Sequence, residues 1–181
     1  MFDYNQSDVE FKAWPKTPRK RDGIITISEK IDGTNACVIV RDGEVVGMQS
    51  RNRLIAPGDD NYGFAFWAFE NREDLIKLGD DYHYGEWAGP GIQGNPHKLT
   101  KKAFFLFNTY RPADTLPECV KQVRVLYTGP RIEAIVDTCM DQLQADAAKA
   151  GYQPEGVIIY DHDTRTYAKD TFQNRKGKWA S

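Results

Sequence analysis

The sequence contains few cysteines and no long apolar run, and each absence excludes a class of protein. Cys37, Cys119 and Cys139 are odd in number, widely spaced and without a C-x-x-C pair, which argues against a disulfide framework and against a zinc site. No apolar run approaches the length of a membrane-spanning helix, and the polar, acidic N-terminus does not resemble a signal peptide. We therefore expect a soluble cytoplasmic protein with no membrane partner.

The chain also lacks a strong net charge. Its 24 Lys and Arg residues nearly balance 26 Asp and Glu residues, giving a formal net charge of −2, so no overall cationic field attracts it to a polyanion. Contacts with nucleic acid would have to come from local basic patches at Lys16–Arg21, Lys98–Lys102 and Arg175–Lys178. Trp14 and Trp179 lie beside two of these patches and could stack on bases, although a solvated loop or terminus explains each patch equally well.

The apolar pattern predicts an α+β fold in one domain over residues 1–181. The chain has the length of one domain, and a hydrophobic content of 40% is enough for a core. β-branched and aromatic runs predict strands at 24–27, 36–40, 45–50, 82–87, 104–110, 123–127, 155–160 and 165–169. Apolar spacing predicts helices over 62–78 and 132–147, the second ended by Gly151. Asp42-Gly43 marks a tight hairpin, and residues 1–21 and 171–181 are expected to be loose.

The most informative segment is Glu29-Lys30-Ile31-Asp32-Gly33-Thr34-Asn35. It places Lys30 at a glycine turn between two apolar strands, where rigid elements hold the amine while a ligand can still reach it. On its own, Lys-x-Asp-Gly is a weak signal, because a solvated surface hairpin could carry it.

Three later segments strengthen the signal. Tyr84–Gly91 places Glu86 at the end of an aromatic strand, Phe104–Phe107 forms another aromatic strand, and Glu155–Tyr160 places a second glutamate before an apolar strand that precedes Lys169. In this order the motifs resemble those of the covalent nucleotidyltransferase superfamily, which contains ATP-dependent DNA and RNA ligases and mRNA capping enzymes. The Thr-Asn ending of the first motif is similar to the RNA ligase 2 branch, since DNA ligases usually carry arginine there.

The resemblance implies two antiparallel sheets, flanked by helices, that form an ATP-grasp-like nucleotide cleft. It also implies that Lys30 attacks the α-phosphate of ATP and forms a lysyl-AMP intermediate. A free lysine is protonated at neutral pH, so nearby cations would have to favour the neutral amine. By the same resemblance, Glu86 binds the ribose, Glu155 holds Mg²⁺ (or Mn²⁺), and Lys169 neutralises the α-phosphate.

Further roles follow from the resemblance. Phe107 would stack on adenine, although an aromatic at strand spacing can equally belong to the core. Arg51 is similar to a phosphate-binding arginine, with Arg53 as the alternative. Glu29 would meet the adenine edge through backbone atoms, and Asn35 would position the 5′-phosphate of the RNA. Asp32 is expected to accept hydrogen bonds within its turn. His97 lies in a proline-flanked loop that could border the cleft, although a solvated loop is the expectation.

The chain departs from the family at the last motif, which usually contains two lysines separated by one residue. Tyr167 and Thr171 flank Lys169 at that spacing, and the only Lys-x-Lys is Lys176-Gly177-Lys178, so both assignments stay open. Asn108 also stands where branch members usually have aspartate.

These features predict a monomeric ATP-dependent RNA ligase consisting of a nucleotidyltransferase domain without a C-terminal OB-fold or RNA-binding domain. Its partners would be RNA ends, in a nicked duplex or in single strands, and a phage-encoded ligase would fit this description. The alternatives are a minimal DNA ligase, a guanylyltransferase-like enzyme, or a non-catalytic nucleotide- or RNA-binding relative. Labelling by ATP or by GTP would separate the enzymes, and binding without a covalent label would indicate the last.

Overall fold

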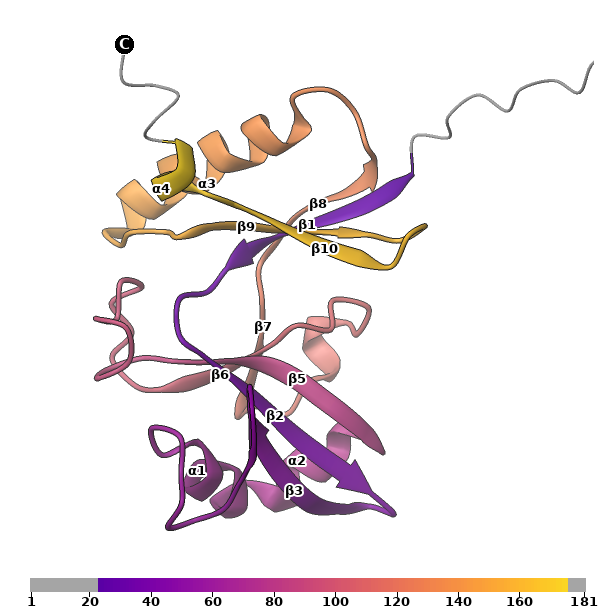
Figure 1. Cartoon of the computed structure of the whole chain (residues 1–181), viewed down its shortest axis with the longest axis vertical. Helices are drawn as coiled ribbons and strands as arrows, with labels where there is room; N and C mark the ends of the chain where they lie inside the picture. Colours follow the sequence, from indigo (N-terminus) through magenta and orange to yellow (C-terminus); the bar gives the residue numbers. More distant parts are fainter. Residues whose placement is uncertain (1–22, 176–181) are drawn as a thin grey trace, which may run out of the picture.

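The computed structural model describes residues 23–175, which form two sheets stacked one above the other (Figure 1). The upper sheet has the strand order β10-β9-β1-β8, and the lower sheet has the order β4-β3-β2-β5-β6-β7. All pairings are antiparallel except that of β6 with β7. The strands are β1 (Ile24–Lys30), β2 (Thr34–Arg41), β3 (Glu44–Ser50), β4 (Leu54–Ile55), β5 (Asp81–Ala88), β6 (Ala103–Leu106), β7 (Val120–Gln122), β8 (Val125–Pro130), β9 (Gly156–Asp161) and β10 (Thr166–Thr171).

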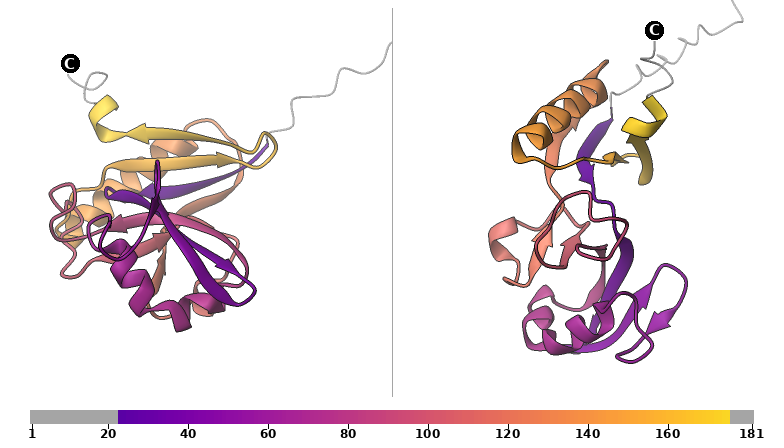
Figure 2. Two further views of the ribbon diagram at one scale, coloured as in Figure 1. Left: turned by 60° about the horizontal axis from the view of Figure 1, so that its bottom comes forward. Right: turned by 90° about the vertical axis from the view of Figure 1, so that its left-hand side faces the viewer.

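Helices cover only the outer faces of the two sheets. The longest, α3 (Ile135–Ala150), packs on the upper sheet, while α1 (Phe64–Glu70), α2 (Arg72–Leu75) and η2 (Ile76–Leu78) lie beneath the lower sheet (Figure 2). The short elements η3 (Ala113–Thr115) and α4 (Phe172–Arg175) complete the described part of the chain. The uncovered faces of the two sheets therefore turn toward one another.

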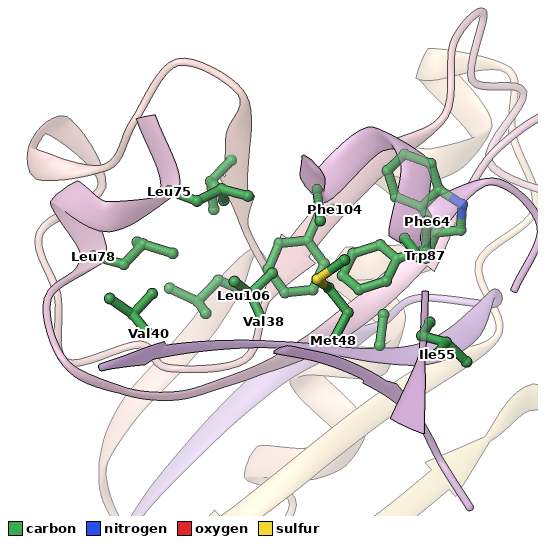
Figure 3. Close-up of a cluster of buried hydrophobic side chains, with 14 of the residues drawn as sticks. Val38, Val40, Met48, Ile55, Phe64, Leu75, Leu78, Trp87, Phe104 and Leu106 are labelled. Carbon is green, nitrogen blue, oxygen red and sulfur yellow. The ribbon is translucent and has the colours of Figure 1, made fainter. Parts of the chain in front are cut away.

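The lower core explains why the helical segment packs where it does. Phe64 is fully buried, with its ring 5.5 Å from that of Trp87 and 5.3 Å from that of Phe104 (Figure 3). These aromatic rings meet aliphatic side chains from the strands and from the α2–η2 segment: Val38, Val40, Met48, Leu75, Leu78 and Leu106. Truncating a buried Phe of this kind costs about 3–5 kcal/mol, so this cluster fixes α1 against the sheet.

The upper core is smaller and sets the orientation of β1. Ile25 and Ile27 point toward α3, where they meet Met140 and Leu143. Because side chains alternate along a strand, Thr26, Ser28 and Lys30 point to the opposite, helix-free face. The burial of two isoleucines thus determines which way Lys30 points.

The α+β class and the order of the predicted strands are confirmed, and several details differ. The expected helix over 62–78 is interrupted at Asn71, and the expected 132–147 helix begins only at Ile135, after Ala134 adopts a left-handed conformation with φ 60°. Gly151 ends that helix as predicted. The Asp42-Gly43 hairpin is present, with φ of 53° and 73° at its two residues. The tail is not loose at its start, because residues 172–175 form α4.

The turn that carries Lys30 is a crossover and not a hairpin. β1 belongs to the upper sheet and β2 to the lower sheet, so residues 31–33 connect the two (Figure 1). A side chain at Gly33 would place a Cβ 2.4 Å from the carbonyl oxygen of Trp87. Glycine is therefore required at this position, because the crossover passes directly against β5.

Candidate active site

Lys30 is the last residue of β1 and lies opposite Gly156 of β9. Its ammonium group forms an ion pair with the carboxylate of Glu155, the residue that precedes β9. Both side chains remain accessible, with 22% of the Lys30 side chain and 30% of the Glu155 side chain exposed. The strand pairing therefore brings together the two residues predicted as nucleophile and metal ligand, and it leaves room for a ligand to reach them.

Two further carboxylates lie in the electrostatic surroundings of Lys30. Burial raises the pKa of Glu86 to about 7, and Glu155 and Asp32 add to the rise, while Lys30 and the backbone N–H of Gly33 oppose it. Burial is also the largest cause of the raised pKa of Asp32. The charge of Glu155 raises this pKa further, while the charges of Lys30 and His97 lower it. No hydrogen bond to the Asp32 carboxylate occurs within residues 23–175, so its expected role within the turn is not observed there.

The site contains more acid than base. When all three carboxylates are ionised, Asp32, Glu86 and Glu155 leave an excess of negative charge around one ammonium group. Within residues 23–175, no group of three or more His, Cys, Asp or Glu side chains is arranged to hold a metal ion by itself. A cation that keeps most of its waters and takes few protein ligands fits such a site, and this is the behaviour of Mg²⁺.

The Thr-Asn ending of the first motif is tied into the lower sheet. Asn35 lies opposite Glu86, and its side-chain amide donates a hydrogen bond of 3.2 Å to the Glu86 carboxylate. The amide of Asn61 donates to the Thr34 hydroxyl at 3.2 Å and to the Asn35 carbonyl at 3.4 Å. Asn35 therefore orients Glu86, in addition to the phosphate role predicted for it.

Lys169 and Phe107 lie on the helix-free faces of opposite sheets. Lys169 of β10 pairs with Ile158 of β9, and Ile158 pairs with Ser28 of β1. Residues paired across neighbouring strands lie on the same face of a sheet. Ser28 shares its face with Lys30, so Lys169 lies on that face too. Phe107 follows β6, and its N–H donates to the carbonyl of Tyr84 at 3.0 Å. Its side chain is 39% exposed, as a ring available for stacking should be.

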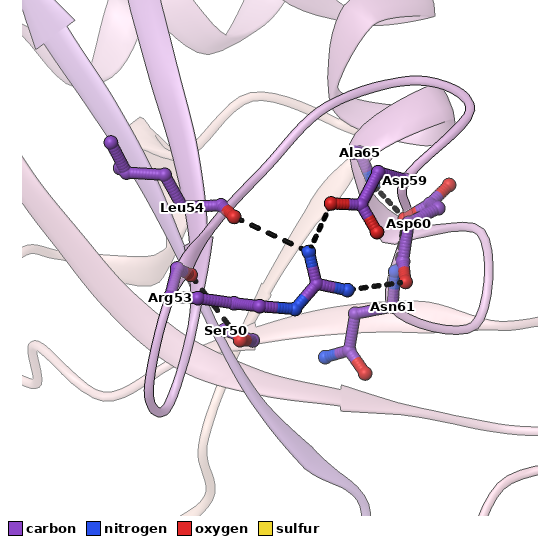
Figure 4. A network of polar contacts seen from close by, with 7 residues as sticks. All are labelled: Ser50, Arg53, Leu54, Asp59, Asp60, Asn61 and Ala65. Carbon is purple, nitrogen blue, oxygen red and sulfur yellow. Dashed lines mark hydrogen bonds and ion pairs between the residues drawn. The ribbon is translucent and has the colours of Figure 1, made fainter.

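The two candidate arginines differ in their surroundings. The guanidinium of Arg53 forms an ion pair of 2.5 Å with Asp59 and donates to the carbonyls of Leu54 and Asp60, each at 3.5 Å (Figure 4). Arg51 is exposed directly after β3, and no hydrogen bond or ion pair with another described residue engages it. Arg51 is therefore the arginine better able to meet a phosphate.

Glu29 and His97 form a buried network that the sequence did not predict. The Glu29 carboxylate accepts a hydrogen bond from the Tyr152 hydroxyl at 2.8 Å and one from His97 Nε2 at 3.2 Å. Only 9% of the His97 side chain and 6% of the Glu29 side chain are exposed, so the expectation that His97 is solvated is wrong. The backbone N–H of Glu29 donates a hydrogen bond to the carbonyl of Arg124. Burial raises the pKa of the Tyr152 hydroxyl to about 12.

The sequence analysis also did not predict several aromatic side chains that lie on the helix-free faces of the two sheets. Tyr82 and Tyr84 of β5 stack with centroids 6.1 Å apart, and Tyr160 and Tyr167 of the upper sheet pack at 4.7 Å. Tyr110, from the segment after β6, forms a hydrogen bond of 2.6 Å with His162, which follows β9, and so links the two sheets. The alternating tyrosines of Tyr82-His83-Tyr84 were the available signal for one such face.

A surface pocket of about 680 Å³ lies elsewhere, between the start of α3 and the turn after β9. Its lining includes Asp137, Asp161 and Asp163, with Arg131 as the cation. None of the residues around the Lys30 amine described above lines it: Lys30, Asp32, Glu86 and Glu155. The acidic lining disfavours phosphate, so we do not place the chemistry there. The predicted alternative Lys176/Lys178 and the patch at Lys16–Arg21 lie outside the described residues, as do Trp14 and Trp179.

Comparison with known families identifies the fold that this site occupies. The family model described as RNA ligase matches residues 23–179, which is most of the chain. The chain belongs to the RNA ligase family. No curated protein sequence matches it significantly. Within residues 23–175, no helix of this RNA ligase family member is long and apolar enough to cross a membrane.

Solved structures of the Naegleria gruberi RNA ligase share the fold. A mutant of that enzyme with ATP and Mn matches with a TM-score of 0.63 and 18% identity, over 87% of this chain and 52% of the other. A mutant with AMP and Mn matches with a TM-score of 0.61 and 20% identity, again over 87% of this chain and 52% of the other. The enzyme with PPi matches with a TM-score of 0.61 and 20% identity, over 88% of this chain and 52% of the other. The chain thus spans about half the length of these relatives. The expected architecture of a ligase adenylation domain is confirmed.

Proposed function

We propose that this chain is the adenylation domain of an ATP-dependent RNA ligase that acts as a monomer and joins 5′-phosphate and 3′-hydroxyl ends of RNA. The observation that carries the proposal is the position of Lys30, a partly exposed amine at a strand end, paired with Glu155 and close to the half-buried Glu86. An amine held at a strand end by rigid elements, where a ligand can still reach it, is suited to covalent catalysis.

The first step would form a lysyl-AMP. The Lys30 Nζ, after losing a proton, attacks the α-phosphorus of ATP, a P–N bond forms, and the P–O bond to pyrophosphate breaks. Lys169, on the same face of the upper sheet, would balance the negative charge that develops on the phosphate. Phe107 would stack on the adenine from the lower sheet, Glu86, oriented by Asn35, would meet the ribose, and Arg51 would contact the phosphates.

A divalent cation fits the acidic surroundings of Lys30. Glu155 would hold Mg²⁺, or Mn²⁺ in its place, with Asp32 and Glu86 adding negative charge around its waters. When bound, the cation supplies positive charge that neutralises the triphosphate. Solved structures of the Naegleria gruberi RNA ligase contain ATP and Mn or AMP and Mn, which supports this choice.

Two later steps would complete the joining. The AMP passes from Lys30 to an RNA 5′-phosphate, and a 3′-hydroxyl then attacks that phosphate and expels AMP. Both are in-line displacements at phosphorus, so positioning and charge neutralisation would carry the catalysis.

The proposal is tested by incubating the protein with Mg²⁺ and α-labelled ATP or GTP, followed by denaturing electrophoresis. Covalent label from ATP, followed by sealing of RNA, supports it, and a nicked duplex compared with single strands identifies the preferred ends. Label from GTP alone would indicate a guanylyltransferase, and sealing of DNA but not RNA would indicate a DNA ligase. ATP binding without label would indicate a non-catalytic relative.

A further inference from the structure

We propose that His97 is a positioning residue that, through Glu29, fixes the backbone next to Lys30 from the side opposite the reactive amine. The inference rests on the proposed function of Lys30. It concerns the β5–β6 loop, residues 89–102, which leaves the lower sheet after Ala88 and returns at Ala103.

The loop holds both residues that flank Lys30. Glu29 and Ile31 are 5% and 6% exposed, although Lys30 between them is accessible. His97 donates a hydrogen bond to the Glu29 carboxylate, and Leu99 packs in one cluster with Ile31. Two side chains of one loop, two residues apart, therefore hold the two neighbours of the amine.

The same network includes the segment that precedes Glu155. The Tyr152 hydroxyl donates to Glu29 at 2.8 Å, and its ring stacks on the His97 ring with centroids 5.2 Å apart. The N–H of Gln153 donates to the carbonyl of Pro96 at 3.1 Å. The segment that leads to Glu155 is thus anchored to the loop that anchors Lys30, and His97 joins them.

The loop has a conformation that its own contacts enforce. Gln93, Asn95 and Lys98 have positive φ angles of 46°, 50° and 50°, which side-chain-bearing residues adopt uncommonly. The Asn95 side chain closes the loop by donating to the Leu99 carbonyl at 2.8 Å and accepting from the Leu99 N–H at 3.0 Å. Strained backbone held in place by local hydrogen bonds is a feature that accompanies functional positions.

The protonation of the imidazole follows from its partner. A carboxylate only accepts hydrogen bonds, so Nε2 of His97 carries the proton that reaches Glu29. Nδ1 is buried and has no hydrogen-bond partner within the described residues. Packing alone does not require an imidazole here, and what the ring contributes to Glu29 is the single N–H.

This assignment is tested by the rate of Lys30 adenylation at saturating ATP, measured beside the dissociation constant for ATP and the melting temperature. His97→Leu keeps the volume and removes the N–H, and it should slow adenylation about 10- to 100-fold, since small displacements of a reacting group have effects of that size. ATP affinity should change less than about threefold. His97→Gln, whose amide can replace Nε2–H, should restore most of the rate, whereas His97→Asn, with a shorter reach, should not.

Thr100→Ala is the matched control, because Thr100 is exposed in the same loop and is not among its positive-φ residues, and it should adenylate at the wild-type rate. Should His97→Leu unfold, Tyr152→Phe, which removes only the second donor to Glu29, provides the milder test and should also slow adenylation. Wild-type rates in the folded His97→Leu or Tyr152→Phe variant, or a loss explained by ATP affinity alone, would overturn the inference. Absence of an adduct in the wild-type protein would instead overturn the proposed function.

Discussion

The ammonium group of Lys30 and the carboxylate of Glu155 form an ion pair although the two residues are 125 positions apart in the chain. The pairing of β1 with β9 places Lys30 opposite Gly156 and so brings Glu155 to the amine. A single contact between two strands of the upper sheet therefore joins the proposed nucleophile to the residue proposed to hold the divalent cation.

Glu155→Gln should therefore nearly abolish self-adenylation. The substitution keeps the size of the side chain but removes the charge that both Lys30 and a divalent cation would meet, and we expect a loss of about 100-fold or more. Quench-flow measurement of AMP incorporation at saturating ATP and Mg²⁺ checks this. Glu44→Gln, an exposed glutamate at the start of β3, serves as control. Equal rates for the two variants would exclude a role for Glu155.

Glu86→Gln should change how stability depends on pH. Because folding raises the pKa of Glu86 from its ordinary 4.5 to about 7, the folded state binds more protons than the unfolded state between these values. The contribution of Glu86 to the free energy of unfolding therefore falls as the pH rises from about 4.5 to about 7, and it is constant at higher pH. At about 1.4 kcal/mol per pKa unit, the resulting loss of folding free energy at high pH has an upper bound of about 3.5 kcal/mol.

Denaturant titrations between pH 5 and pH 8 check the Glu86 prediction. The free energy of unfolding of Glu86→Gln, relative to wild type, should be higher at pH 8 than at pH 5. An unchanged difference across this range would mean that Glu86 titrates normally in the folded protein.

Lys169→Ala should slow adenylation without affecting stability. The residue is exposed on β10, so its removal leaves no cavity, while a cation for the developing phosphate charge is lost. Losses of this kind are about 10²- to 10³-fold. Lys149→Ala, on α3, is the comparison, and it should retain the wild-type rate. If Lys169→Ala adenylates normally, the last motif must lie elsewhere, with Lys176 and Lys178 as the next candidates.

Phe107→Ala should weaken ATP binding by about 5- to 150-fold, because stacking of a base on an aromatic ring contributes about 1–3 kcal/mol. Phe66→Ala is a matched control, since Phe66 is also exposed, at 58% against 39%, but lies on α1 beneath the lower sheet. Calorimetric titration with a non-hydrolysable ATP analogue checks both. Similar affinities for the two variants would place adenine away from Phe107.

Local sequence signals were sufficient for most of the fold. Alternating and β-branched runs located the strands around Lys30, Glu86 and Glu155, and Gly151 marked the end of α3. Boundaries were less predictable where tertiary contacts decide them. Asn71 interrupts the α1–α2 segment, with its amide bonded to the Trp67 carbonyl, although the apolar spacing continues through it.

The sequence indicated only those candidate site residues that belong to a local motif. Lys30, Glu86, Phe107, Glu155 and Lys169 each follow a recognisable strand or glycine pattern. The network around Glu29 has none, because His97 and Tyr152 are 68 and 123 residues away from it and meet it only after both sheets form. A lone histidine between Pro96 and Lys98 carries no signal that it will be buried.

The most direct test of the account is intact-protein mass spectrometry after incubation with ATP and Mg²⁺. We expect one AMP adduct on the wild-type chain, located on Lys30 by peptide mapping, and none on Lys30→Ala. An adduct of equal yield on Lys30→Ala, or one mapped to another residue, would contradict it.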